Sequence, residues 1–164
     1  MISNSSPLIH LTRIGKIDYL IKQVKEIIIP VAVYHEVVTL GKELNFLESF
    51  IIENYINQKK ISIAKVEELD ESRYPPLGKG ELESLELARQ RNEILLLDDK
   101  KARNVARLLK VDHQTTIATV FELLLTNQID KLDYRANIKK LAENSWISAD
   151  ITQEYLERGE KYGR

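Results

Sequence analysis

The chain contains no cysteine, which excludes a disulfide scaffold and a thiolate metal site. No stretch approaches the roughly 20 apolar residues of a membrane span, and the N-terminus shows neither the basic nor the long apolar segment of a signal peptide. A strong charge of either sign is also missing, because the formal net charge is −1. These absences predict a soluble, cytoplasmic protein without a membrane partner, in which any contact with nucleic acid comes from a local patch.

The remaining composition is that of a globular protein. The 164 residues are 43% hydrophobic and 30% charged, which suits one domain with a sizeable core. We therefore expect a single domain over residues 1–164, with its core between about residues 2 and 150 and a charged C-terminal tail at 151–164. Internal repeats and low-complexity segments are absent from the sequence.

Short apolar runs alternate along the chain with segments of helical periodicity. We expect strands at 2–4, 26–29, 61–66 and 94–97. Pro30 should open a helix that Gly41 ends. Further helices are expected at 43–57, 80–91, 100–109, 115–126 and 131–143. In the first of these, the predicted core face consists of Phe46, Leu47, Phe50, Ile51 and Ile56. Alternation of strands and helices predicts an α/β fold whose parallel sheet is covered on both faces.

Polar side chains follow two of the predicted strands. Asn4 comes after the first, and Asp98 and Asp99 come after the run at 94–97. Ligands of parallel sheets bind beyond the carboxyl ends of the strands. Asp98 or Asp99 could also cap the helix that begins near Lys100, with one of the two capping and the other facing a ligand.

Glutamates on two predicted helices could reach the same edge of the sheet. Glu36 lies on the helix after Pro30, and Glu81 and Glu83 lie in the first turn of the helix at 80–91. Carboxylates gathered from distant segments hold Mg²⁺ or Mn²⁺ against a phosphodiester. For Glu81 and Glu83 the competing interpretation is an acidic first turn favoured by the helix dipole. For Glu36 it is a solvated surface position.

Four segments, in this order and spacing, resemble the PIN-domain family, and above all a prokaryotic subgroup that opens with Asn/Asp-Ser-Ser-Pro-Leu-Ile. The matching segments are Asn4-Ser5-Ser6-Pro7-Leu8-Ile9, the segment from Ile28 to Val37, Gly80-Glu81-Leu82-Glu83-Ser84-Leu85-Glu86-Leu87-Ala88, and the segment from Leu95 to Arg103. The resemblance covers nearly the whole chain. It implies a three-layer α/β/α domain with a central parallel sheet and a metal-dependent ribonuclease fold.

The resemblance also implies a site. Asn4, Glu36, Glu83 and Asp99 fall at the family's four acidic positions, with Glu81 a rival for the third and Asp98 for the fourth. Ser6 would brace the first acidic loop. The family's activity is hydrolysis of single-stranded RNA with Mg²⁺ or Mn²⁺. Many members are toxins paired with an antitoxin protein, and homodimers are common.

Three further features bear on activity and partners. Asn4 supplies a carbonyl oxygen but no negative charge, so the alternative is a catalytically impaired PIN-like module that binds RNA or a protein. Lys100, Lys101 and Arg103 form a basic helix segment, which is either a solvated face or a rim that contacts RNA phosphates. The helices at 43–57 and 115–126 carry more apolar residues than one small sheet covers, which predicts a homodimer or a partner helix.

Overall fold

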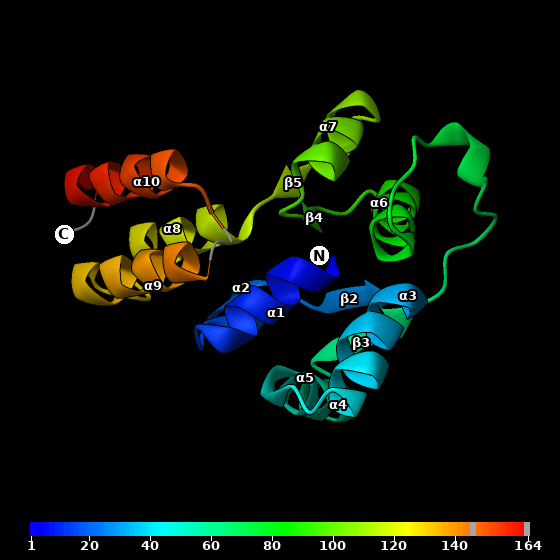
Figure 1. The fold of residues 1–164 in the computed structure, drawn as a ribbon, viewed down its shortest axis with the longest axis horizontal. Coiled ribbons are helices and arrows are strands. Elements are labelled where there is room, and N and C mark those ends of the chain that lie inside the picture. The colour runs from blue at the N-terminus through cyan, green and yellow to red at the C-terminus, as the bar shows by residue number, and fades with distance from the viewer. Residues whose placement is uncertain (145–146, 163–164) are drawn as a thin grey trace.

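A parallel five-stranded sheet organises the fold. The computed structural model describes residues 1–144 and 147–162. The strands are β1 (Ile2–Ser3), β2 (Ile27–Pro30), β3 (Ile61–Ala64), β4 (Leu95–Leu96) and β5 (His113–Gln114), in the spatial order β3-β2-β1-β4-β5 (Figure 1). All four neighbouring pairs are parallel. The chain extends the sheet in one direction to β3 and then crosses to the other side of β1. The order of strands therefore reverses between β1 and β4, the position where such sheets place their ligands.

Helices follow each strand and cover both faces of the sheet. Their bounds are α1 (Ser5–Arg13), α2 (Ile17–Gln23), α3 (Val31–Tyr34), η1 (His35–Leu40), α4 (Gly41–Glu43), α5 (Leu47–Asn57), η2 (Glu71–Arg73), α6 (Lys79–Arg91), α7 (Lys100–Leu108), α8 (Thr116–Leu125), α9 (Lys131–Glu143) and α10 (Ala149–Tyr162). The helices α1, α5, α8 and α9 contribute to one buried cluster, whereas α6 and α7 contribute to the other.

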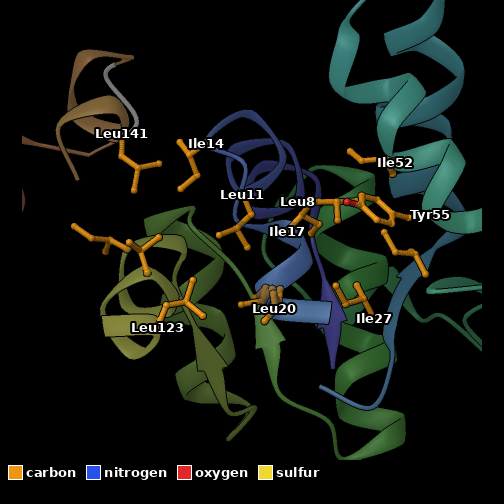
Figure 2. Close-up of a cluster of buried hydrophobic side chains, with 14 of the residues drawn as sticks. Leu8, Leu11, Ile14, Ile17, Leu20, Ile27, Ile52, Tyr55, Leu123 and Leu141 are labelled. Carbon is orange, nitrogen blue, oxygen red and sulfur yellow. The ribbon is translucent and has the colours of Figure 1, made fainter. Parts of the chain in front are cut away.

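Alternation along the strands divides the core into these two clusters. Ile27 and Ile29 of β2 belong to the larger cluster, and Ile28 between them belongs to the smaller one. The larger cluster joins the first helices of the chain to α5 and α8, as the labelled Leu11, Ile52 and Leu123 show in Figure 2. Because each face of the sheet is packed against helices, the predicted three-layer α/β/α class is confirmed.

The helix after β2 does not end at Gly41, contrary to the prediction. It continues from α3 through the π-helical segment η1 into α4. Gly41 is needed there for close packing, since an added Cβ would lie 2.0 Å from the Ser49 hydroxyl oxygen. The glycine thus marks a contact with α5 and not a helix stop. π-Helical turns are rare and occur often at functional sites.

The predicted core face of α5 is wrong in part. Phe46, Leu47 and Phe50 are exposed, with Leu47 at 71% of its full accessibility, whereas Ile51 is half-buried. The buried positions include Glu48, whose carboxylate accepts a 2.8 Å bond from Arg13 Nε on α1. This ion pair and the contact of Ser49 with Gly41 lie on the buried side of the helix with Ile52 and Tyr55, and Phe50 lies on the exposed side. The exposed side chains Leu44, Phe46, Leu47 and Phe50 are called the apolar patch below.

The predicted charged tail is a docked helix. α10 packs on α8 and α9, and its Tyr155 and Leu156 are partly buried against the larger cluster. The Tyr134 hydroxyl donates a 2.7 Å bond to the Tyr155 carbonyl oxygen. Gly159 lets the two helices approach, because an added Cβ would lie 2.3 Å from the Tyr134 ring. The domain core therefore extends beyond residue 150.

Candidate functional site

Asn4 stands at the centre of the carboxyl edge of the sheet. It directly follows β1, which lies between β2 and β4, and its backbone N–H donates a 3.0 Å bond to the Leu96 carbonyl oxygen. Asn4 is also the N-cap residue of α1, but its side chain makes no capping hydrogen bond. Asparagine at this position ordinarily accepts from the first turn of the helix. The buried amide of Asn4 is thus not used for the helix that it precedes.

Glu36 reaches this edge from η1. Its Oε2 accepts a short hydrogen bond from the hydroxyl of Ser5, the residue after Asn4. This hydroxyl belongs to Ser5 and not to Ser6, whose bracing of the first acidic loop stays a prediction. On the other side, the carboxylate lies against Gly80 of α6, where an added Cβ would be 2.8 and 2.9 Å from the two carboxylate oxygens. Only a glycine at position 80 leaves room for Glu36 in this position.

Glu83 and Glu81 have different surroundings, although only Leu82 separates them. Glu83 Oε2 accepts a 2.9 Å bond from the backbone N–H of Ala32, at the start of α3. Glu81 Oε2 instead accepts a 2.9 Å bond from the backbone N–H of Gly78, which closes the first turn of its own helix. Glu83 therefore joins α6 to α3, whereas Glu36 approaches α6 from η1 at Gly80. Glu81 serves its own helix terminus.

Asp98 is held on the other side of Asn4. Its Oδ1 accepts a 2.8 Å bond from the Thr116 N–H, and its Oδ2 accepts a 2.6 Å bond from the Thr116 hydroxyl. His10 Nδ1 lies 2.9 Å from the same Oδ2. His10 is on α1, two turns from Asn4. No spacing in the sequence pointed to this histidine, because 88 residues separate it from Asp98.

Asp99 caps the next helix. Its Oδ1 accepts a 2.7 Å bond from the Ala102 N–H in the first turn of α7. Of the two aspartates, the second thus makes the capping bond and the first joins the buried network with His10 and Thr116. The predicted cap is therefore Asp99, the residue that the resemblance placed at the fourth acidic position. That one of the two aspartates faces a metal ion stays a prediction.

The three predicted carboxylates do not meet at one point. Within residues 1–144 and 147–162, no three Asp, Glu, His or Cys side chains are grouped closely enough to hold a metal ion. Contacts instead join Ser5, Glu36 and the first turn of α6 on one side of Asn4, and His10, Asp98 and Thr116 on the other. Asn4, Glu36 and Glu83 nevertheless offer hard oxygen donors. Mg²⁺ needs only one or two protein carboxylates because it keeps several waters, so this donor set fits such an ion.

The predicted basic rim divides in two. Lys100 and Arg103, in the first turns of α7, line a cavity that also includes Asp98. The Lys101 ammonium points to the preceding loop, where it donates to the Pro76 carbonyl oxygen. The three cations therefore do not form a single surface.

A buried carboxylate anchors the loop between β3 and α6. Glu86, which is 4% exposed, accepts bonds from Arg89 Nε at 2.8 Å and Gln90 Nε2 at 2.8 Å, and a short one from the Tyr74 hydroxyl. These bonds, above all those from the Arg89 guanidinium, lower the pKa of Glu86 to about 2. Desolvation and the bond to Glu86 raise the pKa of Tyr74 to about 12. The loop leading to Gly80 is thus fastened to α6 by an ionised glutamate.

Protonation of Glu86 should therefore destabilise the protein in acid. The carboxyl group titrates near 4.5 when unfolded and near 2 when folded. Its contribution is complete above about pH 4.5 and is lost as the pH falls toward 2, a change of about 2–3 kcal/mol in the free energy of unfolding. Urea denaturation at pH 6 and pH 3 measures it. We expect the free energy of unfolding to fall less between pH 6 and pH 3 for Glu86→Gln than for the wild type. Equal decreases for the two proteins would contradict the stabilising role of the Glu86 carboxylate.

The comparisons with known proteins agree with this architecture. The family model described as a PIN domain matches residues 1–161, nearly the whole chain. The chain therefore belongs to the PIN-domain family, and its fold is of the nuclease-like type. No curated protein matches the sequence. Within the part of the chain that the structure describes, none of the helices has the length and apolar character needed to cross a membrane.

Proposed function

We propose that the protein is a metal-dependent endoribonuclease that cleaves single-stranded RNA at the carboxyl edge of the sheet, around Asn4. The observation that carries this proposal is the position of Asn4. It lies at the strand-order reversal, next to the serine that holds Glu36, and its amide is not used as a helix cap. Membership in a family with a nuclease-like fold supports the same conclusion.

Glu36, Glu83 and the Asn4 amide oxygen would hold Mg²⁺ or Mn²⁺. When bound, such an ion lowers the pKa of a coordinated water and neutralises charge on the phosphate. The protein contributes fixed donors: the Ser5 hydroxyl orients the Glu36 carboxylate, and the Ala32 N–H orients that of Glu83. Asp98 and Asp99 would supply further carboxylate oxygens to the metal site from the other side of Asn4. Asp98 is held in place by His10 and Thr116.

A second candidate function rests on the same residue. Asn4 brings no negative charge, so a metal ion is held by fewer charges than an aspartate at this position would provide. A module that binds RNA or a protein without cleaving it is the alternative that this residue favours.

Cleavage and metal binding, measured separately, distinguish the two functions. The wild-type protein is incubated with a labelled single-stranded RNA in Mn²⁺, in Mg²⁺ and in EDTA, and metal affinity is measured by calorimetry. We expect cleavage in Mn²⁺ and none in EDTA. Metal binding without cleavage, or no binding of either ion, would rule out the nuclease and leave the binding module.

We further propose that the protein is a homodimer whose interface includes the apolar patch, with an antitoxin protein as a further partner if the chain is a toxin. Leu47 and Phe50 are 71% and 45% exposed on adjacent turns of α5. Leu47→Lys combined with Phe50→Lys should convert a dimer into a monomer in light scattering, because two buried charges would oppose association. Leu132→Lys on α9, where the leucine is 80% exposed, is the control and should leave the mass unchanged. A wild-type monomer would overturn the dimer.

A further inference from the structure

A cavity of about 600 Å³ opens beside the proposed site, between the starts of α7 and α8 and the helix α10. Charged side chains of both signs line it, together with apolar ones: Lys100, Arg103, Asp98, Glu154, Ile117, Ile151 and Tyr155, among others. Its volume is in the range of pockets that bind small organic molecules. Through Asp98 it adjoins the network of His10 and Thr116, so a ligand in it would lie next to the edge where Asn4 lies.

One wall of the cavity carries two cations. Lys100 and Arg103 make no ion pair with any residue in the described ranges 1–144 and 147–162. Two carboxylates, Asp98 and Glu154, line the same cavity, but each has another partner. Asp98 is bonded to Thr116 and lies against His10, and Glu154 is paired with Arg158 at 3.6 Å, so neither forms a salt bridge with the two cations. Two unpaired cations at adjacent turns can contact the phosphate of a nucleic acid.

The opposite wall combines apolar side chains and an aromatic ring with the carboxylate of Glu154. Ile117 is buried at the start of α8, and Ile151 lies in the first turn of α10. The Tyr155 ring is held in position by an edge-on contact with Phe121 at 5.9 Å and by the bond that its own carbonyl oxygen receives from Tyr134. Proteins bind unstacked RNA bases between such aromatic and apolar side chains.

We infer that this cavity is a subsite for one unstacked nucleotide of the RNA strand, with its base between Ile117, Ile151 and Tyr155 and its phosphate against Lys100 and Arg103. The inference rests on the proposed function and deepens it, because it names the pocket that would hold one nucleotide of the strand next to the cleaved bond. A nucleotide carries a negatively charged phosphate and a flat base. The cations of one wall would contact the phosphate, and the apolar side chains of the other would contact the base.

The test is RNA binding in EDTA, where no cleavage occurs, measured by fluorescence anisotropy with a labelled single-stranded oligonucleotide. The variant Lys100→Gln/Arg103→Gln removes both cavity cations. Its control, Lys101→Gln/Arg107→Gln, removes the same charge from the same helix, but Lys101 contacts Pro76 and Arg107 bonds to Asn104. We expect the first variant to bind at least about 10-fold more weakly and with a shallower salt dependence, and the control to change by less than about 3-fold.

A second arm tests the base. Ile151→Asn, which makes the apolar wall polar without adding charge, is compared with the wild type on a normal oligonucleotide and on one with abasic sites. The wild type should prefer the normal RNA by about 10-fold, and the variant should lose most of that preference. Melting curves confirm that each variant is folded.

The outcomes separate the subsite from the nuclease. Equal weakening by the two double variants, or no preference of the wild type for RNA with bases, overturns the subsite even if Mn²⁺-dependent cleavage is observed. If the wild type neither binds nor cleaves RNA, the proposed function fails and the subsite fails with it.

Discussion

Gly80→Ala should reduce RNA cleavage by about 100-fold without unfolding the protein. The added methyl group would lie 2.8–2.9 Å from both oxygens of Glu36 and would displace the carboxylate. A misplacement of about 1 Å in a catalytic group can cost this much. The free energy of unfolding should stay within about 1 kcal/mol of the wild-type value, because alanine is the better helix former. Glu36→Gln should cause a similar loss of cleavage, by removing the charge instead of moving it.

Gly78→Ala is the matched control for this experiment. The glycine lies two residues earlier, and an added Cβ would be 3.5 Å from Glu81 Oε2, an ordinary contact. Its cleavage rate should stay within about 3-fold of wild type. Wild-type cleavage by Gly80→Ala, or an equal loss in both glycine variants, would show that the position of Glu36 does not govern the reaction.

Asn4→Asp should increase both metal affinity and cleavage. The substitution preserves the shape of the side chain and adds one negative charge at the carboxyl edge of the sheet. Without metal, repulsion from neighbouring carboxylates should make the protein slightly less stable. A tenfold gain in affinity adds about 1.4 kcal/mol of stabilisation at saturation, which corresponds to about 3–6 °C in Tm for a domain of this size.

The measurement is the Mn²⁺-induced change in Tm of the variant, compared with wild type and with Asn54→Asp. Asn54 is exposed on α5, so the control adds the same charge away from the edge of the sheet. We expect Mn²⁺ to raise the Tm of Asn4→Asp more than that of the wild type, and to raise the Tm of Asn54→Asp only as much as that of the wild type. Identical melting of Asn4→Asp and wild type with and without Mn²⁺, together with no cleavage by either, would support the binding module.

Most of the fold follows from local patterns in the sequence, because the central strands are buried on both faces and therefore appear as continuous apolar runs. β2 and β4 were predictable for this reason. β5 was missed, since His113 and Gln114 carry no apolar signal and the strand exists through its pairing with Leu95 and Leu96. The face of α5 was predicted incorrectly in part, because the buried side also contains Glu48, whose ion pair with Arg13 joins residues distant in sequence.

The site was less predictable than the fold. The family resemblance proposed Asn4, Glu36, Glu83 and Asp98 or Asp99 as site residues, but it gave no direction for each side chain. The choice between neighbouring acids depends on backbone N–H groups, as in the bond from Gly78 to Glu81 and that from Ala102 to Asp99. His10 could not be connected with Asp98 before the helix α1 and the end of β4 were placed side by side.

The π-helical turn that carries Glu36 has a consequence for comparing this chain with others. A π-helix contains more residues per turn than an α-helix, so η1 holds one residue that a regular helix of the same length would not need. A homologue with a regular helix there can be superposed only with a one-residue gap between Glu36 and Gly41. An alignment that forbids gaps within helices would shift either the glutamate or the glycine by one position. Where the glutamate is shifted, the role proposed for Glu36 would be assigned to His35 or Val37, which point in different directions around the helix.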